Sequence, residues 1–218
     1  MNQQFDIKQF LIFIPIVLIS IAIHEFAHCW TTDRLGDDTP RREGRLTLNP
    51  LAHLDPLGTL MIAITAYYGI GFGWGKSSPF NPYNFRHPAR DRMLTAVAGP
   101  ISNLLQVLAW ASIGLLIQSF GYHAGWTGDT PLPLLICWYG MLINASLAVF
   151  NLLPVYPLDG HHILSYFVPP SMRPIVDNPA WGIVFLLLVF NTPILSNILS
   201  PMIDAVVTAS QYTVGWPS

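Results

Sequence analysis

Two histidines with a glutamate between them carry the most evident chemistry of this chain. His24, Glu25 and His28 lie in the pentapeptide HEFAH. On a helix, side chains four residues apart project from one face about one turn apart, so both imidazoles can bind one divalent cation and Glu25 can reach a metal-bound water. The pattern predicts a zinc site that carries out hydrolysis. The alternative is a hydrogen-bonded pair of core histidines that binds no metal.

The surroundings of this motif predict a membrane protein. The motif ends an apolar run at residues 10–30, and hydrophobic residues make up 52% of the 218 residues. Charged residues make up 10%, well below the roughly 25% of soluble domains. An ionisable residue at membrane depth is costly and usually faces a cavity, a partner or a ligand, which favours metal binding. Four further runs lack charged residues and histidine and are about long enough to cross a bilayer: 56–75, 93–120, 132–158 and 178–203.

The charge balance and the cysteines exclude other classes of protein. A net charge of −2, with no basic run outside the loops, argues against a nucleic-acid partner. Cys29 and Cys137 fall in apolar runs without metal-binding or disulfide spacing, so we expect packing thiols. Repeats and linkers are absent from the sequence, and residues 1–218 are expected to form one integral membrane domain. The sequence does not indicate an oligomeric state.

A catalytic zinc normally has three protein ligands and an open position, so a third ligand must come from elsewhere in the chain. Asp159 is the leading candidate because it follows an apolar segment in which Pro154 and Pro157 disfavour continuous helix. Irregular backbone at that depth requires surrounding protein or a water-filled cavity. Asp159 could instead cap a helix that begins near Gly160. The rival ligands are His161 and His162 and, less favoured, the loop residues His53, His87 and His123.

Three motifs of the chain resemble those of the site-2 proteases, which are intramembrane metalloproteases. They occur in the family's order: HEFAH at 24–28, AGPISN at 98–103 and NLLPVYPLDG at 151–160. The intervening loops resemble the compact members without a PDZ domain. One departure follows the Asp-Gly pair, where many relatives have Gly or Ser and then Arg but this chain has His161 and His162.

The resemblance implies roles for five residues. Zinc would be bound by His24, His28 and Asp159, and Glu25 would be the catalytic base. Asn103, from the family's Gly-Pro-x-x-Asn element, would contact the substrate or the reacting carbonyl. An interhelical hydrogen bond is the alternative role for Asn103.

We expect an all-α polytopic membrane protein with about four to five membrane helices. Residues 56–75 would form a re-entrant segment, and residues 73–85 a small β or loop element, because glycines and prolines interrupt its aromatic residues. The expected function is hydrolysis of membrane-embedded proteins or signal-peptide remnants by a metal-activated water. The partners would then be that transmembrane or signal-peptide substrate and the lipid bilayer. Alternatives are a membrane metal-binding transporter and a catalytically inactive homologue that binds membrane proteins.

The requirement that the motifs meet at one depth predicts the topology. If residues 56–75 crossed the membrane fully, Asn103 would be separated from the histidines. A segment that does not cross puts the basic residues on both sides of it on one face, which the positive-inside rule makes cytoplasmic. We therefore expect the active site to open toward the cytoplasm, in a prokaryotic cell membrane. These basic residues are Arg34, Arg41, Arg42, Arg45, Lys76, Arg86, Arg90 and Arg92.

Overall fold

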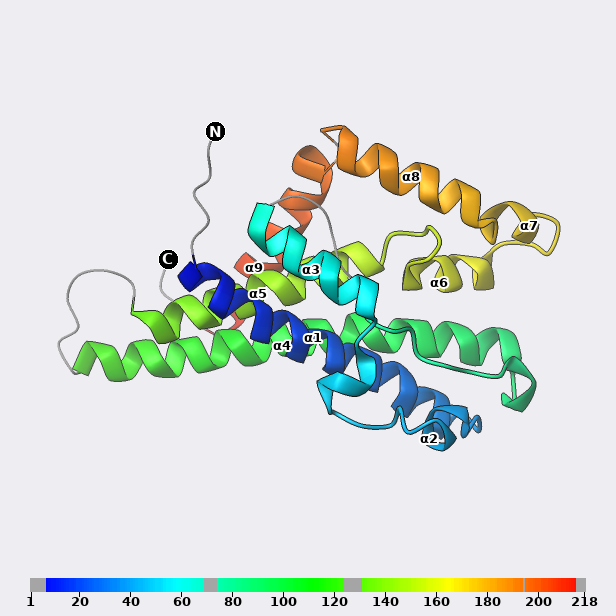
Figure 1. The fold of residues 1–218 in the computed structure, drawn as a ribbon, viewed down its shortest axis with the longest axis horizontal. Helices are drawn as coiled ribbons and strands as arrows, with labels where there is room; N and C mark the ends of the chain where they lie inside the picture. Colours follow the sequence, from blue (N-terminus) through cyan, green and yellow to red (C-terminus); the bar gives the residue numbers. More distant parts are fainter. Residues whose placement is uncertain (1–6, 69–73, 124–130, 194, 215–218) are drawn as a thin grey trace.

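The computed structural model describes residues 7–68, 74–123, 131–193 and 195–214, and within these ranges it contains helices and irregular segments but no named strand (Figure 1). This agrees with the expected all-α class. The helices are α1 (Ile7–Arg34), α2 (Thr39–Arg42), α3 (Pro56–Tyr68), α4 (Pro88–His123), α5 (Leu132–Asn151), α6 (Asp159–Phe167), α7 (Arg173–Val176), α8 (Pro179–Asn191) and α9 (Ser200–Val214). Shorter turns are η1 (Pro50–His53), η2 (Pro82–Asn84) and the π-helical η3 (Leu195–Leu199).

Three helices of the described chain are long and apolar enough to cross a membrane, judged by length and composition. They are α1 over Phe10–Arg34, α4 over Pro88–Gly121, and the whole of α5. The expected four to five membrane helices are not reached by this criterion, because α3 and α8 have only 13 residues each. At 1.5 Å per residue they extend about 20 Å, against a hydrocarbon core of about 30 Å. The run at 178–203 is divided because α8 ends at Asn191, two residues before Pro193.

The longest helix, α4, is central to the packing. It contacts α1, α5, α6 and α9, and Figure 1 shows it along the length of the molecule. A buried apolar cluster joins α1, α3 and α5 through Ile16, Val17, Ile21, Ile62 and Ile143. A second cluster joins α4, α5 and α9 through Val107, Ala111, Met141, Ala145 and Val207. These two clusters fix the positions of the helices that carry the sequence motifs.

The segments on either side of α3 contact one another. Arg45 donates a hydrogen bond to the backbone carbonyl of Lys76 at 2.6 Å, and the Lys76 amide donates to the carbonyl of His53 at 2.8 Å. Further along, the Asn84 side chain donates to Asp37 at 2.8 Å. The chain has therefore returned, by Lys76, to the end of the molecule from which α3 departs, in agreement with a segment that enters and leaves on one side.

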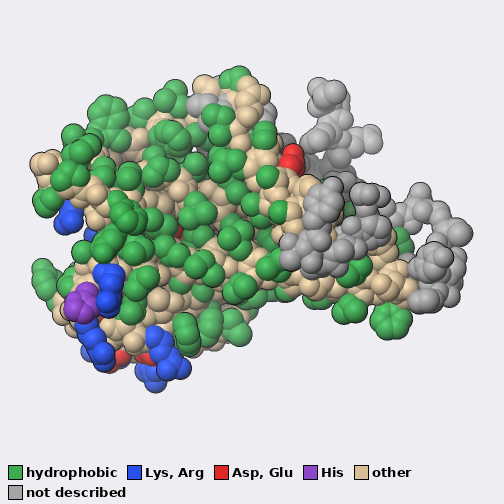
Figure 2. Space-filling view, turned by 180° about the vertical axis from the view of Figure 1, so that it is seen from behind, with side chains coloured by type: hydrophobic (Ala, Val, Ile, Leu, Met, Phe, Trp, Pro, Cys, Tyr) green, Lys and Arg blue, Asp and Glu red, His purple; other side chains and the backbone are tan. Residues whose placement is uncertain are grey.

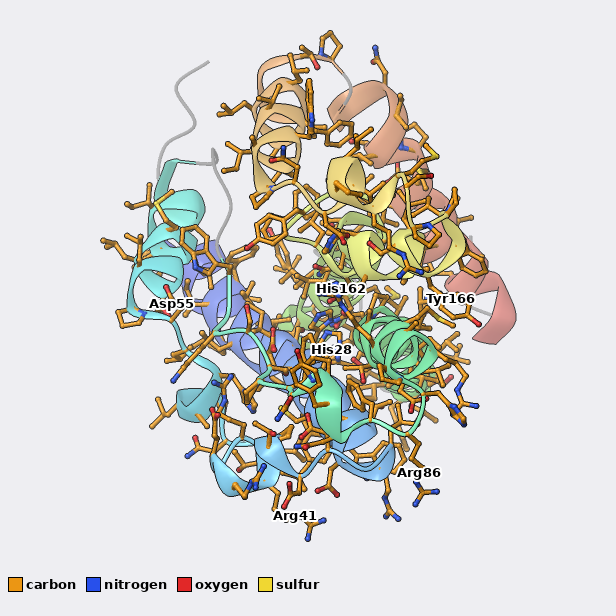
Figure 3. The ribbon with its side chains drawn as sticks, turned by 90° about the vertical axis from the view of Figure 1, so that its right-hand side faces the viewer. His28, Arg41, Asp55, Arg86, His162 and Tyr166 are labelled. Atoms are coloured by element: carbon orange, nitrogen blue, oxygen red, sulfur yellow. The ribbon has the colours of Figure 1, made fainter. Side chains whose placement is uncertain are left out.

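Charged and apolar surfaces are separated. Figure 2 shows hydrophobic side chains over most of one face, with lysines and arginines gathered at one end. Arg41, which precedes α3, and Arg86, which follows it, both lie at one end of the molecule in Figure 3. An apolar face with basic residues at one end is the distribution expected of a membrane protein.

The small β element is less extensive than expected. Within the described residues it consists of one isolated antiparallel bridge between Leu54 and Gly75, and residue 73, the first of the expected element, lies outside the described ranges. Pro79 and Pro82 lack a backbone N–H, so the residues that follow Gly75 cannot form a continuous hydrogen-bonded ladder.

We predict that cysteines placed at Glu43 and Tyr83 will react with a membrane-impermeant thiol reagent from the same side of sealed vesicles, because the loops that carry them contact each other. Both native thiols, Cys29 and Cys137, would be replaced by alanine. A cysteine at Leu132, which follows the far end of α4, should react from the opposite side. Reaction of the first two positions from different sides would contradict a re-entrant α3.

Candidate active site

The side chains of His24 and His28 project from one face of α1, and their Nε2 atoms face each other. Their Nε2 atoms are 3.0 Å apart, and both side chains are buried. The Nδ1 atoms point away: that of His24 donates to the side-chain oxygen of Asn103 at 2.6 Å, and that of His28 donates to the Thr95 carbonyl at 2.7 Å. A proton held on Nδ1 by each acceptor leaves the Nε2 lone pair available to a metal.

Asp159 reaches the same point from α6. The residue before the helix is Leu158, so Asp159 is the first helical residue and does not act as its N-cap. Its Oδ2 lies 3.2 Å from Nε2 of both His24 and His28 and has no hydrogen-bond partner among the described residues. Asp159 therefore points one carboxyl oxygen at two imidazoles.

These three donor atoms have the spacing of a tetrahedral metal site. Zinc binds imidazole nitrogen and carboxylate oxygen at about 2.0–2.2 Å, which separates neighbouring ligand atoms by roughly 3.3 Å. The observed separations are 3.0, 3.2 and 3.2 Å. Since all three atoms present electron pairs, the arrangement is stabilised by a positive charge between them. The donor set fits a zinc ion and leaves a fourth position open.

The rival histidines next to Asp159 are engaged elsewhere. His161 Nε2 lies 2.9 Å from Asp177 Oδ1, whereas His162 Nδ1 accepts hydrogen bonds from the Arg92 guanidinium. Burial and the Arg92 charge lower the pKa of His162 to about 3, so its ring is neutral. Within the part of the chain that the structure describes, the His24, His28 and Asp159 set is the one group of three potential ligand atoms that converges.

Glu25 is held from the loop between α3 and α4. The Ser78 hydroxyl donates to Glu25 Oε2 at 2.8 Å and lies 3.0 Å from the Glu25 carbonyl oxygen. Gly75 passes close to the other carboxylate oxygen, because a Cβ at this position would lie 3.6 Å from Oε1. Sequence reasoning missed Ser78, since nothing in its spacing marks it as a partner for a glutamate 53 residues away.

The site opens into a cavity of about 760 Å³. Its polar wall is formed by residues of α1, α4 and α6 and by the loop at 74–80. Figure 3 shows His28 and His162 near the middle of the molecule. The wall contributed by α5 and α8 is mostly apolar, with Leu147, Phe150, Ile183, Leu186 and Leu187, and Asn151 is its polar member. The cavity can therefore accept an apolar chain while one side of it remains polar.

Known proteins share these features of sequence. The profile of peptidase family M50 matches residues 132–191, which include Asp159. The Bacillus subtilis (strain 168) protein named "Putative zinc metalloprotease YwhC" is 36% identical over 190 residues, which are 87% of this chain and 84% of that protein. Two mycobacterial proteins named "Putative zinc metalloprotease Rip2", from Mycolicibacterium smegmatis and Mycobacterium tuberculosis (H37Rv), are 31% identical. Their matches cover 86% and 83% of this chain and 70% and 66% of the two relatives.

The chain belongs to peptidase family M50. The resemblance to the site-2 proteases, drawn from three short motifs, is confirmed, and the compact form without a PDZ domain agrees with these matches. Family membership and the apolar helices together identify an integral membrane metalloprotease. No solved structure is detectably similar to the chain.

In this M50 peptidase, the Asn103 side chain is buried and supports His24. Its Oδ1 accepts from His24 Nδ1, while its Nδ2 donates to Asn144 Oδ1 at 2.9 Å. Asn144 donates in turn to the Ser20 hydroxyl and to the Gly140 carbonyl, at 2.9 Å each. The interhelical hydrogen bond that the sequence left open is thus present. A contact between Asn103 and a reacting carbonyl stays a prediction, and it would require these hydrogen bonds to break.

A single face of α4 supports both histidines. Thr95, Gly99 and Asn103 follow one another at intervals of four residues and therefore share this face. A Cβ at Gly99 would lie 2.3 Å from His28 Nε2 and 2.6 Å from His24 Cε1, so a larger residue would displace the rings. The M50 peptidase thus needs glycine here for close approach, between two acceptors that orient the imidazoles.

We predict that Asn103→Ala will lower the affinity for zinc by roughly 10- to 100-fold, the usual cost of removing a group that orients a metal-bound histidine. The zinc retained by purified protein during titration with a chelator measures this. Asn144→Ala, one hydrogen bond further from the site, should have a smaller effect. If Asn103→Ala kept full zinc affinity but lost turnover, Asn103 would act on the reacting carbonyl instead.

Proposed function

We propose that this M50 peptidase is an intramembrane zinc metalloprotease. Zinc would be bound by His24, His28 and Asp159, with Glu25 as the catalytic base. The observation that carries the proposal is the convergence of three ligand atoms, 3.0–3.2 Å apart, beside Glu25 in a partly apolar cavity. The names of the relatives support zinc as the metal. A glutamate between two ligating histidines favours hydrolysis over metal transport, since transport has no need of a base at that position.

The residues divide the chemistry between them. Zinc, when bound, supplies Lewis acidity, which favours ionisation of water and polarises the scissile carbonyl. Glu25 accepts the proton of the attacking water and later delivers it to the leaving amine. Because Ser78 donates to Oε2, Oε1 is the atom available for this exchange. His24 and His28 keep their own protons on Nδ1, away from the cavity, and do not compete with Glu25.

The proposed substrates are membrane-embedded proteins or signal-peptide remnants. Support comes from the apolar wall formed by α5 and α8, which suits an apolar chain that enters from the bilayer. A transmembrane helix satisfies its peptide groups within its own coil, so the substrate must unwind locally before Glu25 can act. The polar wall offers water and hydrogen-bonding groups to the backbone exposed in this way. Nucleic acid is not among the proposed partners.

The distribution of charge supports a site that opens toward the cytoplasm, and the bacterial relatives support a prokaryotic cell membrane. The basic end of the molecule contains the loops on both sides of α3, with Arg41 and Arg86 among its arginines. Under the positive-inside rule this end is cytoplasmic. Because α1 ends and α4 begins there, the His28 end of the motif lies toward the cytoplasmic side.

We predict that Glu25→Gln will bind zinc and fold as the wild type does but will lose at least about 100-fold in turnover, because general acid–base catalysis typically contributes 10²–10⁴-fold. Cleavage of a membrane-protein substrate by purified, zinc-loaded enzyme in detergent measures this, and comparative membrane proteomics of wild-type and variant cells would identify the substrates. Turnover near the wild-type rate would reject Glu25 as the base.

Removal of Asp159 should have a different signature. Asp159→Ala is expected to lower both zinc occupancy and activity, since one of three protein ligands is lost. The metal content of the purified protein tests this. Asp204→Asn is the matched control, because it changes an exposed carboxylate on α9, and it should retain zinc. Full zinc retention by Asp159→Ala would indicate His161 or His162 as the third ligand.

A further inference from the structure

Arg92 places a cation in the cavity that holds the proposed metal site. Its guanidinium donates from Nε and Nη2 to Nδ1 of His162, at 3.0 and 2.7 Å. The Cζ atom of Arg92 lies 6.0 Å from the centre of the Phe80 ring, and Phe80 is itself edge-on to His162 at 6.2 Å. All three side chains line the cavity. The His162 ring of α6 and the Phe80 ring of the loop before α4 thus fix the orientation of the Arg92 guanidinium.

Arg92 makes no close ion pair with a carboxylate of the described residues, since none of them lies within 4.0 Å of its guanidinium. His162 cannot supply a counter-charge, because an imidazole that accepts a hydrogen bond at Nδ1 is neutral. A half-buried guanidinium is stabilised by a paired anion. The arrangement therefore indicates a position for an anion.

A second arginine adds to the positive potential. Arg173 of α7 lies close enough to repel the Arg92 charge, and its Nε is buried without a hydrogen-bond partner among the described residues. Asp177 attracts Arg92 from the same region, but its Oδ1 is already engaged by His161 and Ser165. Asp177 is thus the carboxylate nearest to both arginines on this side of the cavity, and it forms no ion pair with Arg92 within 4.0 Å.

We propose that Arg92 binds a carboxylate of the peptide substrate, with His162 as the residue that positions the guanidinium. The proposal rests on the proposed function. A planar guanidinium matches a carboxylate, and the His162 contacts leave Nη1 of Arg92 without a partner in the described chain. His162 follows Asp159 by three residues, a distance of about 5–6 Å along the helix surface. An extended peptide advances about 3.3 Å per residue, so the carboxylate would lie about two or three residues from the scissile bond.

A lipid phosphate is the other anion that a membrane supplies. Arg92 shares its cavity with Glu25 and the metal ligands, so an anion bound there meets the peptide close to the reacting bond. A headgroup resident at this position would instead obstruct the peptide. The shared cavity and the obstruction that a headgroup would cause favour a substrate carboxylate, either an acidic side chain or the C-terminus, over a lipid phosphate.

The test uses pairs of apolar peptides that differ in one carboxylate: Glu against Gln near the scissile bond, and a free against an amidated C-terminus. Zinc-loaded wild type in nanodiscs of zwitterionic lipid should show a KM about tenfold lower for the acidic member of at least one pair, equivalent to about 1.4 kcal/mol, with kcat unchanged. Arg92→Gln should cleave both members with the KM of the neutral one, and Arg92→Lys should keep part of the preference. Arg86→Gln, an exposed arginine at the basic end (Figure 3), is the matched control and should keep all of it.

A binding measurement separates this proposal from the proposed function. Fluorescence anisotropy of labelled peptides with the zinc-loaded Glu25→Gln protein should give a Kd about tenfold lower for the acidic member. The double variant Glu25→Gln/Arg92→Gln should bind both members equally. If wild type cleaves no peptide but the Arg92-dependent preference in binding persists, the carboxylate site stands and the proposed protease activity fails.

Three results would overturn the carboxylate site. One is equal binding of both members of every peptide pair by protein with Arg92 intact. Another is a preference for the acidic peptide that persists in folded, zinc-loaded Arg92→Gln protein. If that variant does not fold, an undiminished preference in Arg92→Lys protein would count against the site in the same way. The third is a dependence on anionic lipid and not on the peptide carboxylate, which would assign Arg92 to a headgroup.

Discussion

Three electron-pair donors lie within 3.2 Å of one another in a largely buried site, and the arrangement of the helices depends on holding them there. Without a cation such a convergence is unfavourable, so rigid elements must maintain it. Two donors come from one face of α1, where helical spacing alone sets their separation. The third begins α6 after a proline-containing segment that turns the chain back toward α1. Helix α4 lies beside the histidines and supplies the acceptors that fix both rings.

Features of the site set by residues close in sequence could be predicted, whereas contacts between residues far apart in sequence could not. The histidine pair was predictable because its four-residue spacing is local. The convergence of Asp159 on this pair was predictable because a zinc site would need a third ligand and Asp159 follows an apolar segment. The contact of Ser78 with Glu25 and that of Arg92 with His162 join residues 53 and 70 apart, and no spacing rule connects them. The apolar runs predicted where helices form, but not how long they are, since residues 178–203 are divided near Pro193 and α3 has only 13 residues.

The two histidines after the Asp-Gly pair show why a departure from a family pattern need not disturb a site. They point in different directions from α6: His161 toward Asp177, and His162 toward Arg92 on α4. The first contact ties α6 to the residues that follow it, and the second ties α6 to the central helix. Both contacts lie within the first turn of α6, immediately after Asp159. They therefore restrain the carboxylate and do not compete with it for a metal.

The hydrogen-bonded chain from Ser20 through Asn144 and Asn103 to His24 has a consequence for how the protein matures. Within hydrocarbon no hydrophobic effect draws helices together, so buried amide contacts of this kind contribute to their association. These hydrogen bonds start on α1, pass through α5 and α4, and return to α1 at His24, a proposed metal ligand. A bundle in which one helix is displaced by a turn would lose both the association and the orientation of His24. A half-assembled molecule, in which these helices have not yet packed, would therefore lack the ordered His24 side chain that the proposed hydrolytic site requires.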